Sequence, residues 1–292
     1  MYINDLQYSS NILHFILYAD DSNLFISGND IKNTCAILNN ELQSVNKWFL
    51  ANKLKLNVDK TSCMVFKTKN KNINLNDVNL HIAGINVPIV HSTKFLGVTL
   101  DDHLTWNHHV DVVCSKISRA IGAINKISAI VPSNVLLDLY FTMILPHLMY
   151  CNIVWGNCAK YLLNRIHILQ KRAIRIISKS HPLTHTDPLF EKFNLLTIYE
   201  INKFCTCTFT YSYINDLLPK FLNDCFIENN SRNTYNTRQS NLLYIPYYKY
   251  NVSRRTIRYT GPLLWNVIPE YIKYADSLSS FKDNYKNFLL NH

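Results

Sequence analysis

The feature that most restricts the fold is an acidic dipeptide enclosed by two apolar, β-prone runs near the start of the chain. Residues 12–17 read Ile-Leu-His-Phe-Ile-Leu, and residues 22–26 read Ser-Asn-Leu-Phe-Ile. Between them, the segment Tyr-Ala-Asp-Asp at residues 18–21 brings two carboxylates to the connection. Two short β-prone runs with so few residues between them predict a β-hairpin with an acidic tip.

Such a tip suits divalent-metal chemistry. Successive side chains of a strand alternate between its faces, but a tight turn can direct neighbouring carboxylates toward one point. Paired carboxylates on a rigid turn can hold a divalent cation that polarises phosphoryl oxygens. The alternative is an ordinary turn, because Asp is a common turn residue and the same dipeptide recurs at Asp101-Asp102.

Further segments accompany this hairpin in a set order. Residues 2–6 read Tyr-Ile-Asn-Asp-Leu before it, and the later segments lie at residues 46–54, 56–61, 94–98, 104–110 and 259–266. In this order and spacing the chain resembles the reverse transcriptases of non-LTR (LINE-type) retrotransposons, and among them the jockey-like group. The resemblance extends from the hairpin to the C-terminus.

The resemblance implies roles for the residues of the hairpin and of a later lysine segment. Asp20 and Asp21 would be catalytic carboxylates and Mg²⁺ ligands in a two-metal site. Tyr18 would lie beneath the primer terminus. Lys60, in a segment that flanks the nucleotide triphosphate in the family, could neutralise charge or protonate the leaving pyrophosphate. The alternative for Lys60 is a solvated lysine at the start of a strand.

Residues 94–98 resemble the family hairpin that grips the primer end. Lys94 would contact nucleic acid, and Gly97 would allow close approach of a sugar-phosphate backbone. The alternative for Gly97 is a strand glycine at a bulge. The implied reaction adds deoxynucleotides to a DNA primer on an RNA template, so the implied partners are the template, the primer and a dNTP.

The chain departs from the family before the hairpin. The family uses a further metal-binding aspartate on an earlier palm strand, a glycine-rich nucleotide pocket and fingers. Only 17 residues precede Tyr18, and Asp5 is their one carboxylate. We therefore expect an N-terminally truncated polymerase that is inactive alone. The rival interpretation, from another class, is a non-catalytic nucleic-acid-binding remnant.

The sequence pattern predicts an α+β fold. By resemblance, residues 1–103 would form a partial palm of antiparallel strands with a helix, residues 104–182 a helical thumb, and residues 183–292 a C-terminal extension. Strands are expected at 62–67 and 95–100, a hairpin across 78–90, and an extended piece near 241–250, after a candidate boundary at 229–241. Helices are expected at 30–52, 133–150, 161–179, 197–215 and 277–291. From Thr105 onward the pattern also turns helical, with Thr105 as the N-cap and an apolar stripe of Val110, Val113, Ile117, Ile121 and Ile124.

The helix expected at 161–179 carries a cationic face. Its apolar side includes Ile166, Ala173 and Ile177. An amphipathic helix with such a face can follow the phosphates of a nucleic acid. The alternative is an ordinary solvated charged face. The candidate nucleic-acid-binding cations are Arg165, Lys171, Arg172 and Arg175.

Composition supports the same class of partner. The net charge of +10 favours a polyanion, although a basic surface alone does not identify one. The eight cysteines lack paired zinc-ligand spacing, and we expect reduced thiols in an intracellular protein. No segment is apolar for long enough to suggest a membrane partner. Nucleus and cytoplasmic ribonucleoprotein both stay open, and so does the oligomeric state.

Overall fold

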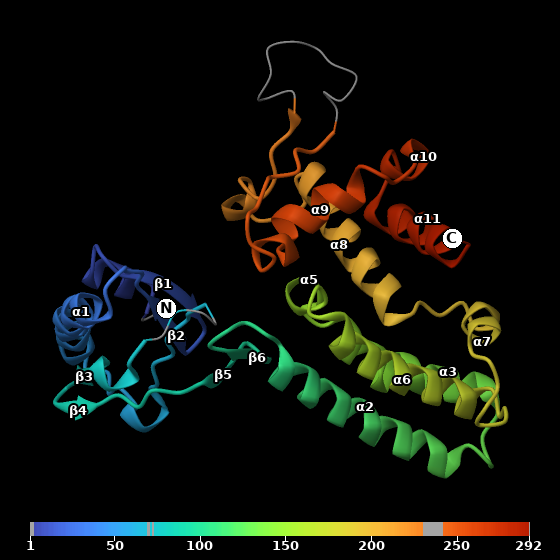
Figure 1. The fold of residues 1–292 in the computed structure, drawn as a ribbon, viewed down its shortest axis with the longest axis horizontal. Helices are drawn as coiled ribbons and strands as arrows, with labels where there is room; N and C mark the ends of the chain where they lie inside the picture. The colour runs from blue at the N-terminus through green and yellow to red at the C-terminus, as the bar shows by residue number, and fades with distance from the viewer. Residues whose placement is uncertain (1–2, 69–70, 72, 230–241, 292) are drawn as a thin grey trace. The chain divides into compact units, whose positions relative to one another are not determined.

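The computed structural model describes residues 3–68, 71, 73–229 and 242–291 (Figure 1). They form two compact units, Met1–Leu104 and Thr105–His292. The first unit combines small antiparallel sheets with one long helix, and the second is helical. This architecture is compatible with the predicted α+β class. In the described part of the chain, none of the helices has the length and apolarity needed to cross a membrane.

The first unit contains three hairpins, one long helix and three short 3₁₀ helices. Each hairpin is a separate two-stranded antiparallel sheet. The elements are η1 (Leu6–Ser9), β1 (His14–Tyr18), β2 (Asp21–Phe25), α1 (Ile31–Ala51), η2 (Val58–Lys60), η3 (Leu75–Asp77), β3 (His81–Ile82), β4 (Ile85–Asn86), β5 (Ser92–Phe95) and β6 (Val98–Asp101).

Two hairpins confirm their predictions and two strand predictions are wrong. The acidic hairpin forms as β1–β2, and the hairpin expected across 78–90 forms as the shorter pair β3–β4. Residues 95–100 do not form one strand, because a turn at Leu96-Gly97 separates β5 from β6. Residues 62–67 form only an isolated bridge between Cys63 and Ile89. The ladder does not continue, because the Lys67 backbone N–H donates to the Asp102 carbonyl and the Asp102 N–H donates to the His91 carbonyl, each at 3.1 Å.

Helix α1 organises the first unit. Asp30 caps it by accepting a hydrogen bond from the Asn33 backbone N–H at 2.9 Å. Cys35 and Leu42 pack in one cluster with apolar side chains of residues 78–87, while Val45 packs in a second cluster with the first hairpin. The helix predicted at 30–52 is therefore confirmed, and it supports two hairpins at different points along its length.

The second unit contains ten helices within the described residues, together with two short 3₁₀ helices. They are α2 (Asn107–Ile127), α3 (Ser133–Met143), α4 (Leu145–Met149), α5 (Asn152–Trp155), α6 (Lys160–Ile177), α7 (Asp187–Lys192), α8 (Ile198–Ile214), η4 (Lys220–Leu222), η6 (Ser253–Arg255), α9 (Ile257–Trp265), α10 (Glu270–Lys273) and α11 (Leu278–Leu290).

The long helices match their predictions, with two corrections. Thr105 does not cap α2; the N-cap residue is Trp106, at a φ of 71°. The segment 133–150 is two helices rather than one, since Pro146 cannot donate the backbone hydrogen bond that would continue α3 into α4. Near 241–250 the described residues form no named strand, and Leu243 makes one isolated bridge. The boundary expected at 229–241 lies almost wholly outside the described residues.

A buried amide joins three helices of the second unit. Gln170 of α6 has no exposed surface. Its Nε2 group donates to the Tyr140 hydroxyl at 3.0 Å and to the Leu196 carbonyl at 3.3 Å, and its Oε1 atom accepts from the Ile198 backbone N–H at 2.8 Å. Burial raises the pKa of Tyr140 to about 12. One side chain thus connects α3, α6 and the start of α8.

We expect Gln170→Leu to destabilise the second unit by about 3 kcal/mol, because it leaves several buried polar groups without a hydrogen-bond partner. Tyr140→Phe removes one partner and is expected to cost about 1 kcal/mol. Urea unfolding followed by tryptophan fluorescence in a Trp48→Phe background measures both, since the other three tryptophans lie in this unit. A Gln170→Leu variant no less stable than Tyr140→Phe contradicts the central role of this amide.

Candidate active site and nucleic-acid interface

The acidic tip is a two-residue turn. Tyr18 pairs with Asp21 at the end of the β1–β2 ladder, so Ala19 and Asp20 form the connection. Ala19 has a φ of 52°, a left-handed conformation that is costly for a residue with a side chain. Both carboxylates are exposed. The strained turn holds Asp20 in the loop and Asp21 at the first position of a strand.

One face of this hairpin is open to solvent. The register places Tyr18 beside Asp21 and His14 beside Phe25. Ile16 lies between them on the same face, because residues two apart in a strand share a face. Ile16 and Phe25 are each 39% exposed, and Tyr18 is 63% exposed. The carboxylates thus border an exposed apolar surface, which could accept the sugars and bases of a nucleic acid.

The two carboxylates fit part of a magnesium site. Mg²⁺ commonly binds through one or two carboxylates together with water and substrate phosphates. Asp20 and Asp21 could supply such a pair. Among the described residues, no group of three or more His, Cys, Asp or Glu could hold a metal ion. A site with two ions needs more ligands than these two residues provide.

The other predicted residues of the first unit are exposed and lie on a 3₁₀ helix and on the third hairpin. Lys60 ends η2, where its backbone N–H and the Thr61 hydroxyl both donate to the Asn57 carbonyl, at 3.2 and 2.9 Å. Lys94 lies on β5, and Gly97 lies in the β5–β6 turn with a φ of 82°. The hairpin expected from residues 94–98 is therefore present. Of the described ion pairs, none joins Lys60 or Lys94 to the carboxylates of the tip.

The structure separates the predicted cations of α6. Arg165 forms an ion pair with Asp111 of α2, and the Arg175 Nε group donates to the Thr184 carbonyl at 2.9 Å. Lys171 is half-buried near His167, whose pKa is lowered, mainly by burial and then by this lysine. Arg172 is exposed, and no described ion pair includes it. The face is therefore not one continuous row of available charges.

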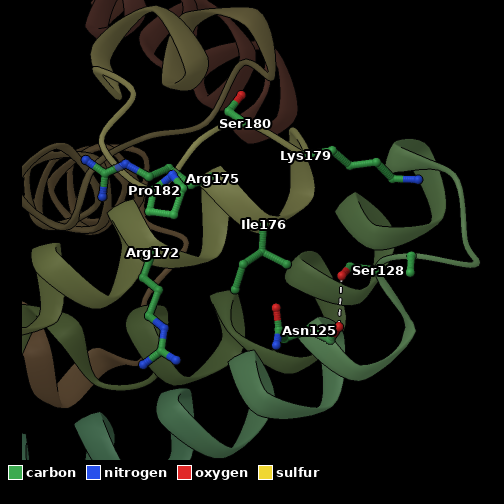
Figure 2. Close-up of a pocket in the computed structure, with 9 residues that line it drawn as sticks. Asn125, Ser128, Arg172, Arg175, Ile176, Lys179, Ser180 and Pro182 are labelled. Carbon is green, nitrogen blue, oxygen red and sulfur yellow. Dashed lines mark hydrogen bonds between the residues drawn. The ribbon is translucent and has the colours of Figure 1, made fainter.

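Three cations nevertheless border one hollow at the end of α6. The hollow has a volume of about 520 Å³ and lies between the last turns of α2 and α6. Arg172, Arg175 and Lys179 line it together with Asn125 and Ser128. Their charged ends point in different directions (Figure 2). We name this hollow, with its three cations, the α6 groove. Because the three charged ends point apart, they suit several phosphates along a backbone better than one enclosed anion.

Gln170 is the residue that pattern reasoning missed on this helix. The apolar side of α6 was expected from its aliphatic residues alone, yet its buried positions include this amide. Leu169 and Ile176, which the sequence also suggests as apolar, are only half-buried. The usable signal was the position of Gln170 four residues after Ile166 and three before Ala173, on the same helical face.

Comparison with known proteins gives the class of the relatives. The chain is 27% identical over 190 residues to a probable RNA-directed DNA polymerase from the transposon BS of Drosophila melanogaster, covering 63% of this chain and 20% of that protein. No family model matches, and no solved structure matches. The relatives found are polymerases of mobile elements, and the chain spans about a fifth of their length.

Two further relatives come from the mobile element jockey. The chain is 27% identical over 168 residues to the RNA-directed DNA polymerase from the mobile element jockey of Drosophila melanogaster, and 26% identical over 168 residues to its counterpart in Drosophila funebris. Each match covers 55% of this chain and 18% of the relative. The predicted resemblance to jockey-like, non-LTR retrotransposon reverse transcriptases is confirmed.

We expect the turn at Ala19 to control the stability of the acidic hairpin. Ala19→Val places a β-branched side chain at positive φ and should cost about 1–2 kcal/mol, whereas Ala19→Asn should be tolerated. Amide hydrogen exchange of β1 and β2 should then be about tenfold faster in the valine variant than in the asparagine variant. Exchange in the separate β5–β6 sheet serves as the internal control. Equal exchange in both variants contradicts strain at this turn.

Proposed function

We propose that this chain is a part of an RNA-directed DNA polymerase that carries the acidic palm hairpin and helices that hold nucleic acid. In this proposal residues 1–103 belong to the palm, 104–182 to the thumb and 183–292 to a C-terminal extension. The observation that carries it is the exposed Asp20–Asp21 tip, in a chain that is 27% identical over 55–63% of its length to polymerases of mobile elements.

Within that proposal, each predicted residue keeps a chemical role. Asp20 and Asp21 hold Mg²⁺, which supplies charge stabilisation to the transferring phosphoryl group when bound. Tyr18, beside Asp21 in the ladder, offers its exposed ring to the primer terminus. Lys60 contacts the triphosphate, and the turn containing Gly97 approaches the primer backbone. The nucleic-acid substrates are an RNA template and a DNA primer.

A second candidate function is nucleic-acid binding without catalysis. The observation that favours it is the contrast between the two groups of charges. The cations of the α6 groove lie at the surface of the hollow. Contacts to phosphates need only a positive charge that can approach the nucleic-acid backbone. The acidic tip has only two carboxylates for chemistry that uses more ligands. We propose that these 292 residues bind primer–template on their own without extending the primer.

We expect duplex binding to depend on the α6 groove. The chain should bind primer–template duplex with a Kd on the order of 10⁻⁴–10⁻⁶ M at physiological salt, independently of sequence. Replacing Arg172 and Lys179 with Gln should reduce the slope of log affinity against log salt by about two units. Fluorescence anisotropy across a salt series measures the slope, with circular dichroism to verify folding.

The matched control is Arg119→Gln with Lys203→Gln, which removes one exposed arginine and one exposed lysine from other helices of the same unit. The net charge of the two double variants is identical. An equal change of slope in both would mean that the α6 groove is merely a solvated face, and the binding proposal for it would be wrong.

We expect no primer extension by the purified 292-residue chain with Mg²⁺ or Mn²⁺, because two carboxylates do not hold the ion pair of a two-metal site. A primer labelled at its 5′ end and annealed to an RNA template gives the readout on a denaturing gel. Template-dependent extension that Asp20→Ala abolishes would contradict this expectation and would favour the catalytic candidate over the binding one.

A further inference from the structure

A loop of the second unit carries both charges and rings, and neither group belongs to the α6 groove. It runs from Leu243 through η6 to the start of α9. No Asp or Glu occurs between Glu228 and Glu270 in the sequence. The cations of the described loop are Lys249, Arg254, Arg255 and Arg258, and its outward rings are Tyr247 and Tyr250. We name the segment 243–258, which carries these six residues, the Tyr–Arg loop.

The Tyr–Arg loop is held in place at both ends. At one end the Leu243 backbone N–H donates to Asn266 Oδ1 at 3.1 Å, and Asn266 Nδ2 donates to the Leu243 carbonyl at 2.9 Å. Farther along, the Arg254 Nε group donates to the Tyr248 carbonyl at 3.0 Å, and the Tyr248 ring lies 6.3 Å from the Tyr259 ring. Little ordering cost would therefore accompany binding here.

Two rings of the loop project into solvent. The exposed fraction is 83% for Tyr247 and 68% for Tyr250. Lys249 lies between them in the sequence, and its Nζ atom is 5.8 Å from the centroid of the Tyr250 ring. Rings this exposed contribute little to the core, and the ring faces that Lys249 does not cover can stack on a planar ligand.

The four charges of the loop are not neutralised, while Arg254 donates to the Tyr248 carbonyl and Arg258 is hydrogen-bonded to the Cys225 side chain. Of the described carboxylates, none forms an ion pair with Lys249, Arg254, Arg255 or Arg258. All four of these residues are exposed. This differs from α6, where Arg165 is already paired with Asp111. Four cations with no acidic residue among them favour a polyanion over a protein surface, where apolar contact would dominate.

We propose that the Tyr–Arg loop binds single-stranded nucleic acid, with Tyr247 and Tyr250 stacking on unpaired bases and the four cations contacting the backbone. This combination of aromatic platforms and cations is how proteins bind single strands without reading their sequence. A duplex keeps its bases stacked on one another, so it cannot offer them to these rings. The inference does not rest on the proposed polymerase role, because it uses none of the residues assigned there.

The test compares single-strand and duplex binding by the full 292-residue chain. Tyr247→Ala with Tyr250→Ala should weaken binding of a labelled 20-nucleotide uridine oligomer by about tenfold or more, since each stacked base contributes substantially. Duplex binding through the α6 groove should be unchanged. The matched control is Tyr271→Ala with Tyr274→Ala, which removes two rings of similar exposure, 70% and 75%, from the α10 region. An equal loss in this control would overturn the proposal.

Conservative variants separate stacking from apolar contact. Tyr247→Phe with Tyr250→Phe should bind the oligomer like the wild type, whereas the corresponding double leucine variant should bind like the double alanine variant. Leucines that preserve affinity would overturn the stacking role. Circular dichroism and thermal unfolding verify that each variant is folded, so a loss of binding is not a loss of structure.

Charge is tested separately. Lys249→Gln with Arg255→Gln should reduce the salt slope for the oligomer by about 1.4 units, at about 0.7 for each phosphate contact on a single strand. The Arg172→Gln and Lys179→Gln double variant should keep its affinity for the oligomer. If that variant loses the oligomer while the Tyr–Arg loop variants retain it, single strands bind at α6 and the proposal is wrong. Failure of duplex binding alone would instead count against the proposed α6 function.

Discussion

The second unit depends on the hydrogen bonds of one buried amide. Gln170 satisfies groups from α3, from the segment before α8 and from the first turn of α8. The same turn is closed by a capping box in which Thr197 and Glu200 exchange hydrogen bonds. From this junction α8 leads to the aromatic core, where Tyr211 stacks on Phe281 with ring centroids 4.4 Å apart. The α6 groove and the C-terminal helices therefore share one internal anchor.

The two proposed binding surfaces use charge in different ways. The α6 groove presents cations at helix ends, where they also complement the partial negative charge of the helix C-terminus. The Tyr–Arg loop combines its cations with exposed rings, so it can discriminate between paired and unpaired bases. A nucleic acid with a duplex part and a single-stranded part offers a partner to each surface. A copied RNA template has both parts, and this agrees with the class of the relatives.

The sequence pattern predicted the elements that depend on interactions between residues close in the sequence, above all the long helices. The stripe of α2, which includes Val110, Ile117 and Ile124, is buried as expected, because the helical period alone fixes it. The strand expected at 62–67 did not form, because a strand needs a partner that is distant in the sequence, and this segment meets such a partner only at the bridge between Cys63 and Ile89. The pairing of Arg165 with Asp111, 54 residues away, leaves no trace in the spacing of either helix. The α6 hollow also depends on contacts between distant residues. The helical pattern of α6 therefore identified its cations but could not show which of them line one hollow.

The separation of the three hairpins has a mechanical consequence. The strands of each sheet are neighbours in the sequence, and no backbone ladder runs from one hairpin to another. Side-chain packing on α1, and not a shared sheet, sets the position of the acidic tip. The hairpin that contains Lys94 and Gly97 can therefore adjust relative to that tip without breaking a row of hydrogen bonds. In the proposed polymerase role, a primer that contacts both hairpins would fix the spacing between them.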